Sequence, residues 1–203
     1  GITISSSGNV DSIGIVTATT FYGDGSNLSN ITSTTINTNA DNRVITGSGT
    51  ANTLNGESNL TFDGSILSVN SVNVGKGTNS VAGNTVLGEA ALDAAVTGSN
   101  NTAIGNVSAT TLTSGHSNTA VGSQSLQLGT TGDFNVAVGK DALRYFVAGN
   151  NTAVGADAMQ GANGSSTGNN NVAVGNQALF ACTTGTLNTA VGRLSLAANT
   201  TGQ

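Results

Sequence analysis

A five-residue phrase, Asn-[Thr/Val]-Ala-[Val/Ile]-Gly, occurs six times from Asn101 onward and once before that in the variant form Asn84-Thr-Val-Leu-Gly88, and it constrains the fold more than any other feature of the chain. The glycines that close its seven copies are Gly88, Gly105, Gly122, Gly139, Gly155, Gly175 and Gly192, so the usual spacing is 17 residues. Repetition at a fixed period predicts a solenoid. A period of 17 is too short for a pair of helices, but it fits one coil of a parallel β-solenoid with short strands and glycine corners.

In such a solenoid, equivalent residues of successive coils lie about 4.8 Å apart and form columns. Asparagine stands four residues before every repeat glycine, at Asn84, Asn101, Asn118, Asn135, Asn151, Asn171 and Asn188. Stacked asparagine amides can hydrogen-bond from one layer to the next. We therefore predict that this column is a structural ladder rather than a ligand site.

Two apolar columns are predicted to form the core. The first immediately precedes each repeat glycine and comprises Leu87, Ile104, Val121, Val138, Val154, Val174 and Val191. The second follows it by four residues and comprises Leu92, Leu126, Leu143, Met159, Leu179 and Leu196, with Ala109 in the remaining coil. Alternation along a strand places Thr152 and Val154 on one face and Asn151 and Ala153 on the other. We expect the alanine-lined face to be covered by other chains.

The composition supports an ordered β protein and argues against several functions. Charged residues are 7% and aromatic residues 3% of the chain, proline is absent, and the net charge is -5. Disordered chains usually combine high net charge, proline and few β-branched residues, whereas Val, Ile and Thr are abundant here. Five basic residues are too few to neutralise a nucleic-acid backbone or to hold an anionic membrane. No apolar run is long enough to insert into a bilayer.

Residues 1–75 lack the 17-residue period, and residues 76–203 carry it. The first segment contains short runs such as Arg43-Val-Ile-Thr46 and Asn59-Leu-Thr-Phe62, separated by Gly, Asn and Asp. This pattern is typical of short strands and turns. We predict a β-rich, shaft-like region that precedes a solenoid of about seven coils. Its large apolar residues are too few to stabilise a core alone, which favours association between chains.

The repeats resemble the head repeats of trimeric autotransporter adhesins and, more closely, repeats in bacteriophage tail-fibre proteins. The stretches GIVTATTFYGDGSNLSNI (14–31) and NADNRVITGSGTANTLNGESNLTFDGSILSV (39–69) resemble phrases in virion structural and fibre proteins of marine, cyanophage-like tailed phages. This resemblance implies a parallel homotrimer. It also implies a structural role in a virion or on a cell surface.

Candidate catalytic and binding residues are few. Asp141 and Asp157 follow adjacent repeat glycines by two residues, so stacking would bring them about 4.8 Å apart, near the roughly 5 Å carboxylate separation of retaining glycosidases. Glutamine occupies the same position in two other coils, which indicates an ordinary outward polar site. His116 is expected to contact Asp133 of the next coil. We predict no enzyme activity, no cofactor and no metal site, and we interpret Asp24 as a turn residue and Cys182 as a small packing residue.

We therefore predict a non-enzymatic structural fibre, virion-borne or extracellular, that spaces a receptor-binding tip. Its expected partners are copies of itself in a homotrimer, end-to-end neighbours in the fibre, and a glycan or protein receptor on a host surface. The alternatives are a cell-surface adhesin or a self-assembling extracellular fibril, glycosylated at Asn106 or Asn163 if the source organism modifies sequons. An ice-binding solenoid is a weaker alternative, because Val136 and Val172 interrupt the single threonine column.

Overall fold

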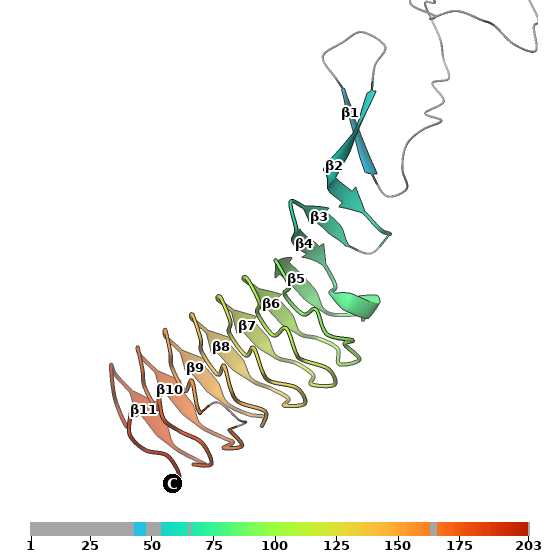
Figure 1. Ribbon diagram of the computed structural model, residues 1–203. Coiled ribbons are helices and arrows are strands. Elements are labelled where there is room, and N and C mark those ends of the chain that lie inside the picture. The colour runs from blue at the N-terminus through green and yellow to red at the C-terminus, as the bar shows by residue number, and fades with distance from the viewer. Residues whose placement is uncertain (1–42, 48–53, 65, 163–165, 203) are drawn as a thin grey trace, which may run out of the picture. The chain divides into compact units, whose positions relative to one another are not determined.

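The computed structural model describes residues 43–47, 54–64, 66–162 and 166–202, and all of them belong to one compact unit, Thr38–Gln203. The described chain is all-β apart from one short 3-10 turn, Thr78–Ser80. Its eleven strands form one sheet in sequence order (Figure 1). The strand-like runs that were expected before residue 43, together with Asp24, lie outside the described residues.

The first strands pair antiparallel. They are β1 (Arg43–Gly47), β2 (Leu54–Phe62), β3 (Leu67–Val69) and β4 (Val72–Gly75), and β4 in turn pairs antiparallel with β5 (Thr85–Gly88). Asn70 and Ser71 alone connect β3 to β4, with φ angles of 47° and 70°. Two left-handed residues in a two-residue loop are the mark of a tight type I′ hairpin, which matches the twist of the strands. The strands predicted at 43–46 and 59–62 are confirmed.

The strands from β5 onward are parallel and stack in register. They are β6 (Thr102–Ile104), β7 (Thr119–Val121), β8 (Val136–Val138), β9 (Thr152–Val154), β10 (Val172–Val174) and β11 (Thr189–Val191). Each strand contributes three consecutive residues to the pairing. Each of the three pairs with the residue at the same position of the repeat in the next coil. Six successive parallel pairings make a β-solenoid of about six turns (Figure 1). The predicted parallel solenoid and its 17-residue period are thus confirmed, with about six turns instead of the predicted seven coils.

Glycine is required where the backbones of neighbouring coils meet. Gly105 has a φ of +129°, and a Cβ atom added there would lie 2.6 Å from the carbonyl oxygen of Gly122. Three further corner positions in each coil are also left-handed but carry side chains, as at Phe134, Asp141 and Leu143, with φ angles of 57°, 57° and 52°. Non-glycine residues adopt this conformation at a cost. The repeated left-handed corners are what close a coil within 17 residues.

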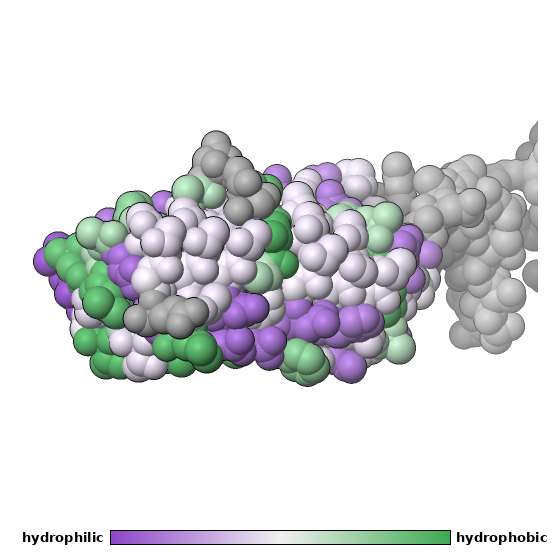
Figure 2. All heavy atoms as spheres, turned by 90° about the horizontal axis from the view of Figure 1, so that it is seen from below, coloured by the Kyte–Doolittle hydropathy of each residue, from purple (hydrophilic) through white to green (hydrophobic). Residues whose placement is uncertain are grey.

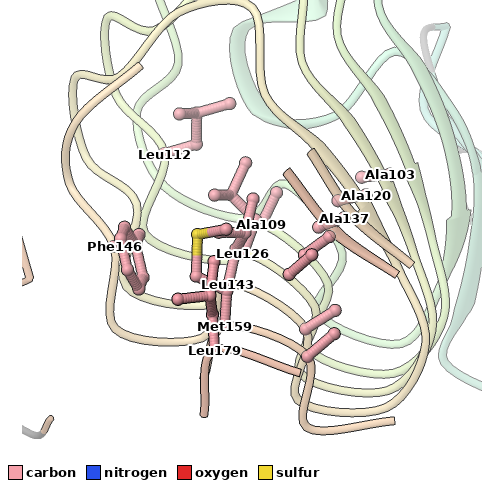
Figure 3. Close-up of a cluster of buried hydrophobic side chains, with 14 of the residues drawn as sticks. Ala103, Ala109, Leu112, Ala120, Leu126, Ala137, Leu143, Phe146, Met159 and Leu179 are labelled. Atoms are coloured by element: carbon pink, nitrogen blue, oxygen red, sulfur yellow. The ribbon is translucent and has the colours of Figure 1, made fainter. Parts of the chain in front are cut away.

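Alanine and leucine, not valine, fill the interior. The central alanines of β6 to β10 are fully buried: Ala103, Ala120, Ala137, Ala153 and Ala173. Opposite them, the column predicted four residues after the repeat glycine is also inside, at Leu92, Leu126, Leu143, Met159 and Leu179 (Figure 3). Leu196 of the last coil is the exception and is 48% exposed. Leu112, Phe146 and Cys182 complete the far wall of the interior.

The column immediately before the repeat glycines was placed on the wrong side. Leu87, Val154, Val174 and Val191 are between 37% and 69% exposed, and Ile104, Val121 and Val138 are half-buried. The predicted alternation is correct, but the alanine face is the inner one. The interior is narrow because leucine and phenylalanine project into it from the opposite wall, so only alanine fits beneath the strands. The alanine face therefore needs no partner chain.

The one long spacing, between Gly155 and Gly175, is absorbed at a corner. Before the additional residues, the Gly161 N–H donates to the Phe180 carbonyl at 3.0 Å, and after them Ser166 forms a parallel bridge with Phe146 of the preceding coil. The hydroxyl of Ser166 is buried and accepts the Ala162 N–H at 3.1 Å. Within the described residues, no helix has the length and apolar character needed to cross a membrane.

Candidate interaction surfaces

The asparagine column forms a continuous buried ladder. The expected amide-to-amide bonds are present where Asn118, Asn171 and Asn188 donate to the preceding asparagine, and bonds to the backbone add to them. Each Oδ1 accepts the backbone N–H of the next asparagine, as Asn84 does from Asn101 at 2.8 Å. Each Nδ2 donates to a carbonyl at the second corner of the coil, as Asn101 does to Gly115 at 2.8 Å. The seven members, Asn84, Asn101, Asn118, Asn135, Asn151, Asn171 and Asn188, are at most 6% exposed. These amides join coils and are closed to a ligand.

The last rung of the ladder is closed within its own coil. Asn199 Nδ2 donates to Asn188 Oδ1 at 3.0 Å, and Asn199 Oδ1 accepts the Gly202 N–H at 2.9 Å. Asn199 occupies the repeat position where Leu112, Phe146 and Cys182 are buried in other coils. Sequence reasoning missed this cap. The available signal was that Asn199 is the one polar residue of its column.

Asp141 is not the outward polar residue that its column suggested. It is 2% exposed, and its carboxylate is paired with Lys140 and with Arg144 Nη1, the latter at 3.1 Å. Arg144 also donates from Nε to Gln127 Oε1 at 2.8 Å and lies 5.1 Å from the centre of the Tyr145 ring. The hydrogen bond and charge of Asp141 raise the pKa of Lys140. Both carboxylate oxygens of Asp141 are engaged, whereas a retaining glycosidase requires one to attack the sugar.

His116 and Asp133 meet, but not through the imidazole ring. Asp133 Oδ1 accepts the backbone N–H of His116 at 2.7 Å. The ring Nδ1 of His116 accepts the backbone N–H of Ser99 at 3.1 Å, which assigns the neutral ring proton to Nε2. Side chains of successive coils thus satisfy backbone donors at one corner. The arrangement joins coils, and the Ser99 hydroxyl also lies 3.4 Å from the same ring nitrogen.

Other candidate positions are structural or fall outside the described residues. Cys182 is buried, its Sγ lies 3.7 Å from the Gly185 carbonyl oxygen, and burial raises its pKa. In the described part of the chain, no three His, Cys, Asp or Glu side chains are grouped as a metal site would require. Asn106 is exposed and donates to Glu89 at 3.1 Å, but the hydroxyl of its sequon residue Ser108 is buried. Asn163 lies outside the described residues.

An apolar column runs along the outer face of the sheet across both strand arrangements. Cross-strand pairing aligns Phe62 with Leu67, Leu67 with Val74, and Val74 with Leu87. Parallel pairing then continues this outer column through Ile104, Val121, Val138, Val154, Val174 and Val191. Phe62 is 50% and Val74 42% exposed. Sequence reasoning missed the continuity because it depends on the register of the antiparallel strands.

A second apolar surface lies at the end of the solenoid. Leu187 and Val191 are 68% and 69% exposed, and Leu194 and Leu196 are 45% and 48% exposed. In Figure 2, hydrophobic side chains gather at the end of the molecule where β11 lies. β11 pairs with β10 on one side only. The other edge of β11 therefore presents backbone groups beside apolar side chains.

The opposite side of the β2–β3 hairpin holds a polar pocket of about 300 Å³. It is lined by Ser58, Asn59, Thr61, Ser68, Asn70 and Ser71. None of these side chains is charged or aromatic.

Comparison of the chain with known protein families, curated proteins and solved structures finds no match.

Proposed function

We propose that this protein is a non-enzymatic structural component of a fibre, in which copies associate along the outer column. The observation that most supports this proposal is the outer column. It is apolar and uncharged from Phe62 to Val191, and the chain's own fold leaves it partly uncovered. Asp141, which was a candidate for chemistry, pairs with Arg144 at a corner instead.

The periodicity of the outer column favours other copies of this chain as the partner. Its side chains recur at the strand spacing of about 4.8 Å, and the adjacent threonine and valine column recurs at the same spacing. A second copy in parallel orientation has the same spacing and the same change from antiparallel to parallel strands. Each outer-column side chain of one copy can therefore face an outer-column side chain at the same level of the other copy. Three copies around one axis would cover the column on every chain, which agrees with the homotrimer implied by the resemblance to fibre and adhesin repeats.

In this role the chain spaces a receptor-binding tip from a virion or a cell surface. A self-assembling extracellular fibril, whose copies would associate through the same outer column, is the alternative.

The test is the mass of the folded protein in solution, measured by native mass spectrometry and light scattering. The wild type should be a trimer. A Val121→Glu, Val138→Glu variant should give monomers with an unchanged β circular-dichroism spectrum, because both side chains lie on the outer face. The charge-matched control Thr131→Glu, Thr184→Glu, at two exposed corner positions, should remain trimeric. A monomeric wild type, or a trimer that survives the double substitution, contradicts the proposal.

A further inference from the structure

We propose that the pocket formed by β2, β3 and the Asn70-Ser71 turn binds a neutral saccharide unit. The pocket has a volume of about 300 Å³, at the small end of the range for ligand sites. Its lining is composed wholly of hydroxyl and amide side chains. This chemistry complements the hydroxyl groups of a sugar and offers nothing to compensate the desolvation of a charged ligand.

The register of the hairpin explains why the polar side chains converge. Thr61 pairs with Ser68 across the two strands, and the Asn70 N–H donates to the Asn59 carbonyl at 2.8 Å, one pair further along the same face. Side chains of successive same-face pairs project from one side of a sheet. Thr61 and Ser68 therefore lie side by side on one face of the hairpin, and Asn59 and Asn70 line the same pocket. The tight left-handed turn holds Asn70 and Ser71 in place.

The hydrogen-bonding groups of this pocket are available. Elsewhere in the molecule, buried amides and hydroxyls are used internally, as in the asparagine ladder and the bond from Ser108 to the Ala120 carbonyl. Within the described part of the chain, the six side chains that line the pocket make no such internal bond. They can each donate and accept, which a polyhydroxylated ligand requires.

The Thr61 and Ser68 pair of the pocket and the Phe62 and Leu67 pair of the outer column occupy opposite faces of the same strands. Leu60 and Phe62 alternate with Asn59 and Thr61 along β2, so assembly through the apolar face leaves the polar face accessible. The pocket itself does not depend on the proposed assembly. Because it lacks an aromatic platform, one site should bind weakly, and the proposed trimer would raise the apparent affinity by presenting three sites.

The experiment measures binding of free glucose, galactose, mannose, N-acetylglucosamine and N-acetylgalactosamine by saturation-transfer NMR and titration. At least one sugar should bind with millimolar affinity. Asn59→Ala should weaken it about tenfold and Thr61→Val with Ser68→Ala by more than that, because each removes bonds to the sugar. Asn176→Ala, an exposed asparagine of the solenoid, is the matched control and should bind as the wild type does.

Binding of none of the five sugars at millimolar concentration overturns the proposal, and so does binding that survives the pocket substitutions. Preference for charged sugars would also contradict it. The Val121→Glu, Val138→Glu variant separates this inference from the proposed assembly. It should bind free sugar like the wild type and lose only the enhanced retention on surfaces that carry many copies of that sugar.

Discussion

The amide of Asn101 holds Asn118 of the next coil at two points. Its Oδ1 accepts the Asn118 backbone N–H at 2.9 Å and the Asn118 Nδ2 at 3.1 Å. Asn101 Nδ2 meanwhile donates across the coil to the Gly115 carbonyl at 2.8 Å. One side chain thus ties its own coil together and joins it to the next. In a solenoid whose interior is lined by alanine, these buried bonds supply cohesion that a thicker apolar core would otherwise provide.

The ladder should be sensitive to loss of a single rung. Asn118→Ala removes the Nδ2 bond to Gly132 and leaves the Asn135 N–H without its acceptor, in a site that is 1% exposed. We expect a loss of about 2–4 kcal/mol in the free energy of unfolding, measured by urea denaturation. The exposed Asn176→Ala should change it by less than about 0.5 kcal/mol. Equal stability of the two variants would show that the ladder is dispensable.

The inner and outer positions of one strand should respond oppositely to size. Ala137 is fully buried against the opposite wall, so Ala137→Leu should destabilise the fold by about 1–3 kcal/mol or more through overpacking. Val154→Leu, at a position 37% exposed on the outer face, should be nearly neutral in the separated chain. Thermal denaturation of both in the Val121→Glu, Val138→Glu background measures this without interference from assembly. A reversed order would mean that the valine face is inside.

Replacing Phe134 should stabilise the protein. Its φ is 57° and its side chain is 61% exposed, while Asn100, Asn150 and Asn170 occupy the equivalent left-handed corner in other coils. Asparagine tolerates this conformation better than phenylalanine. Phe134→Asn should therefore raise the free energy of unfolding by about 0.5–1 kcal/mol, seen as a higher melting temperature. A lower melting temperature would indicate that Phe134 makes a stabilising contact outside the single chain.

Asn199 should control fraying of the last coil. Asn199→Ala removes the bonds to Asn188 Oδ1 and to the Gly202 N–H. Amide hydrogen exchange should then accelerate in residues 188–202 and remain unchanged in β7, because local opening at a solenoid end does not require global unfolding. Thr201→Ala is the neighbouring control. Unchanged exchange in the last coil of Asn199→Ala would contradict the capping role.

Cys182 should report on unfolding and on alkaline stability. Burial raises its pKa above the ordinary value of about 9, so the folded protein resists thiol reagents at pH 8 and reacts on unfolding. A folded pKa above the unfolded one contributes stability that is complete below the unfolded pKa and is lost as pH rises through the folded pKa. The difference in urea midpoint between wild type and Cys182→Ala should therefore change only above about pH 9. Rapid labelling of the folded protein would contradict this burial.

The sequence by itself determined the parts of the structure that follow from repetition. Because seven phrases recur at one period, stacking of equivalent residues is the simplest way to pair every strand, and this predicted the parallel solenoid, the asparagine ladder and the leucine column. Strand alternation likewise predicted that Asn151 and Ala153 share a face. These features depend on spacing within one coil, which the repeat displays directly.

Only the tertiary structure decided which face is inside. Alternation defines two faces of a strand but not the distance to the opposite wall, and here Leu143 and Phe146 fill that distance, so Ala137 lies inside and Val138 outside. Burial of Asp141 depends on Lys140 and Arg144 folding back over it, and the polar pocket depends on the register that the Asn70-Ser71 turn sets between β2 and β3. The repeat period specifies which residues stack along the solenoid axis, but it does not specify which residues meet across the interior. Each of these three outcomes depends on contacts of the second kind, and so only the tertiary structure shows them.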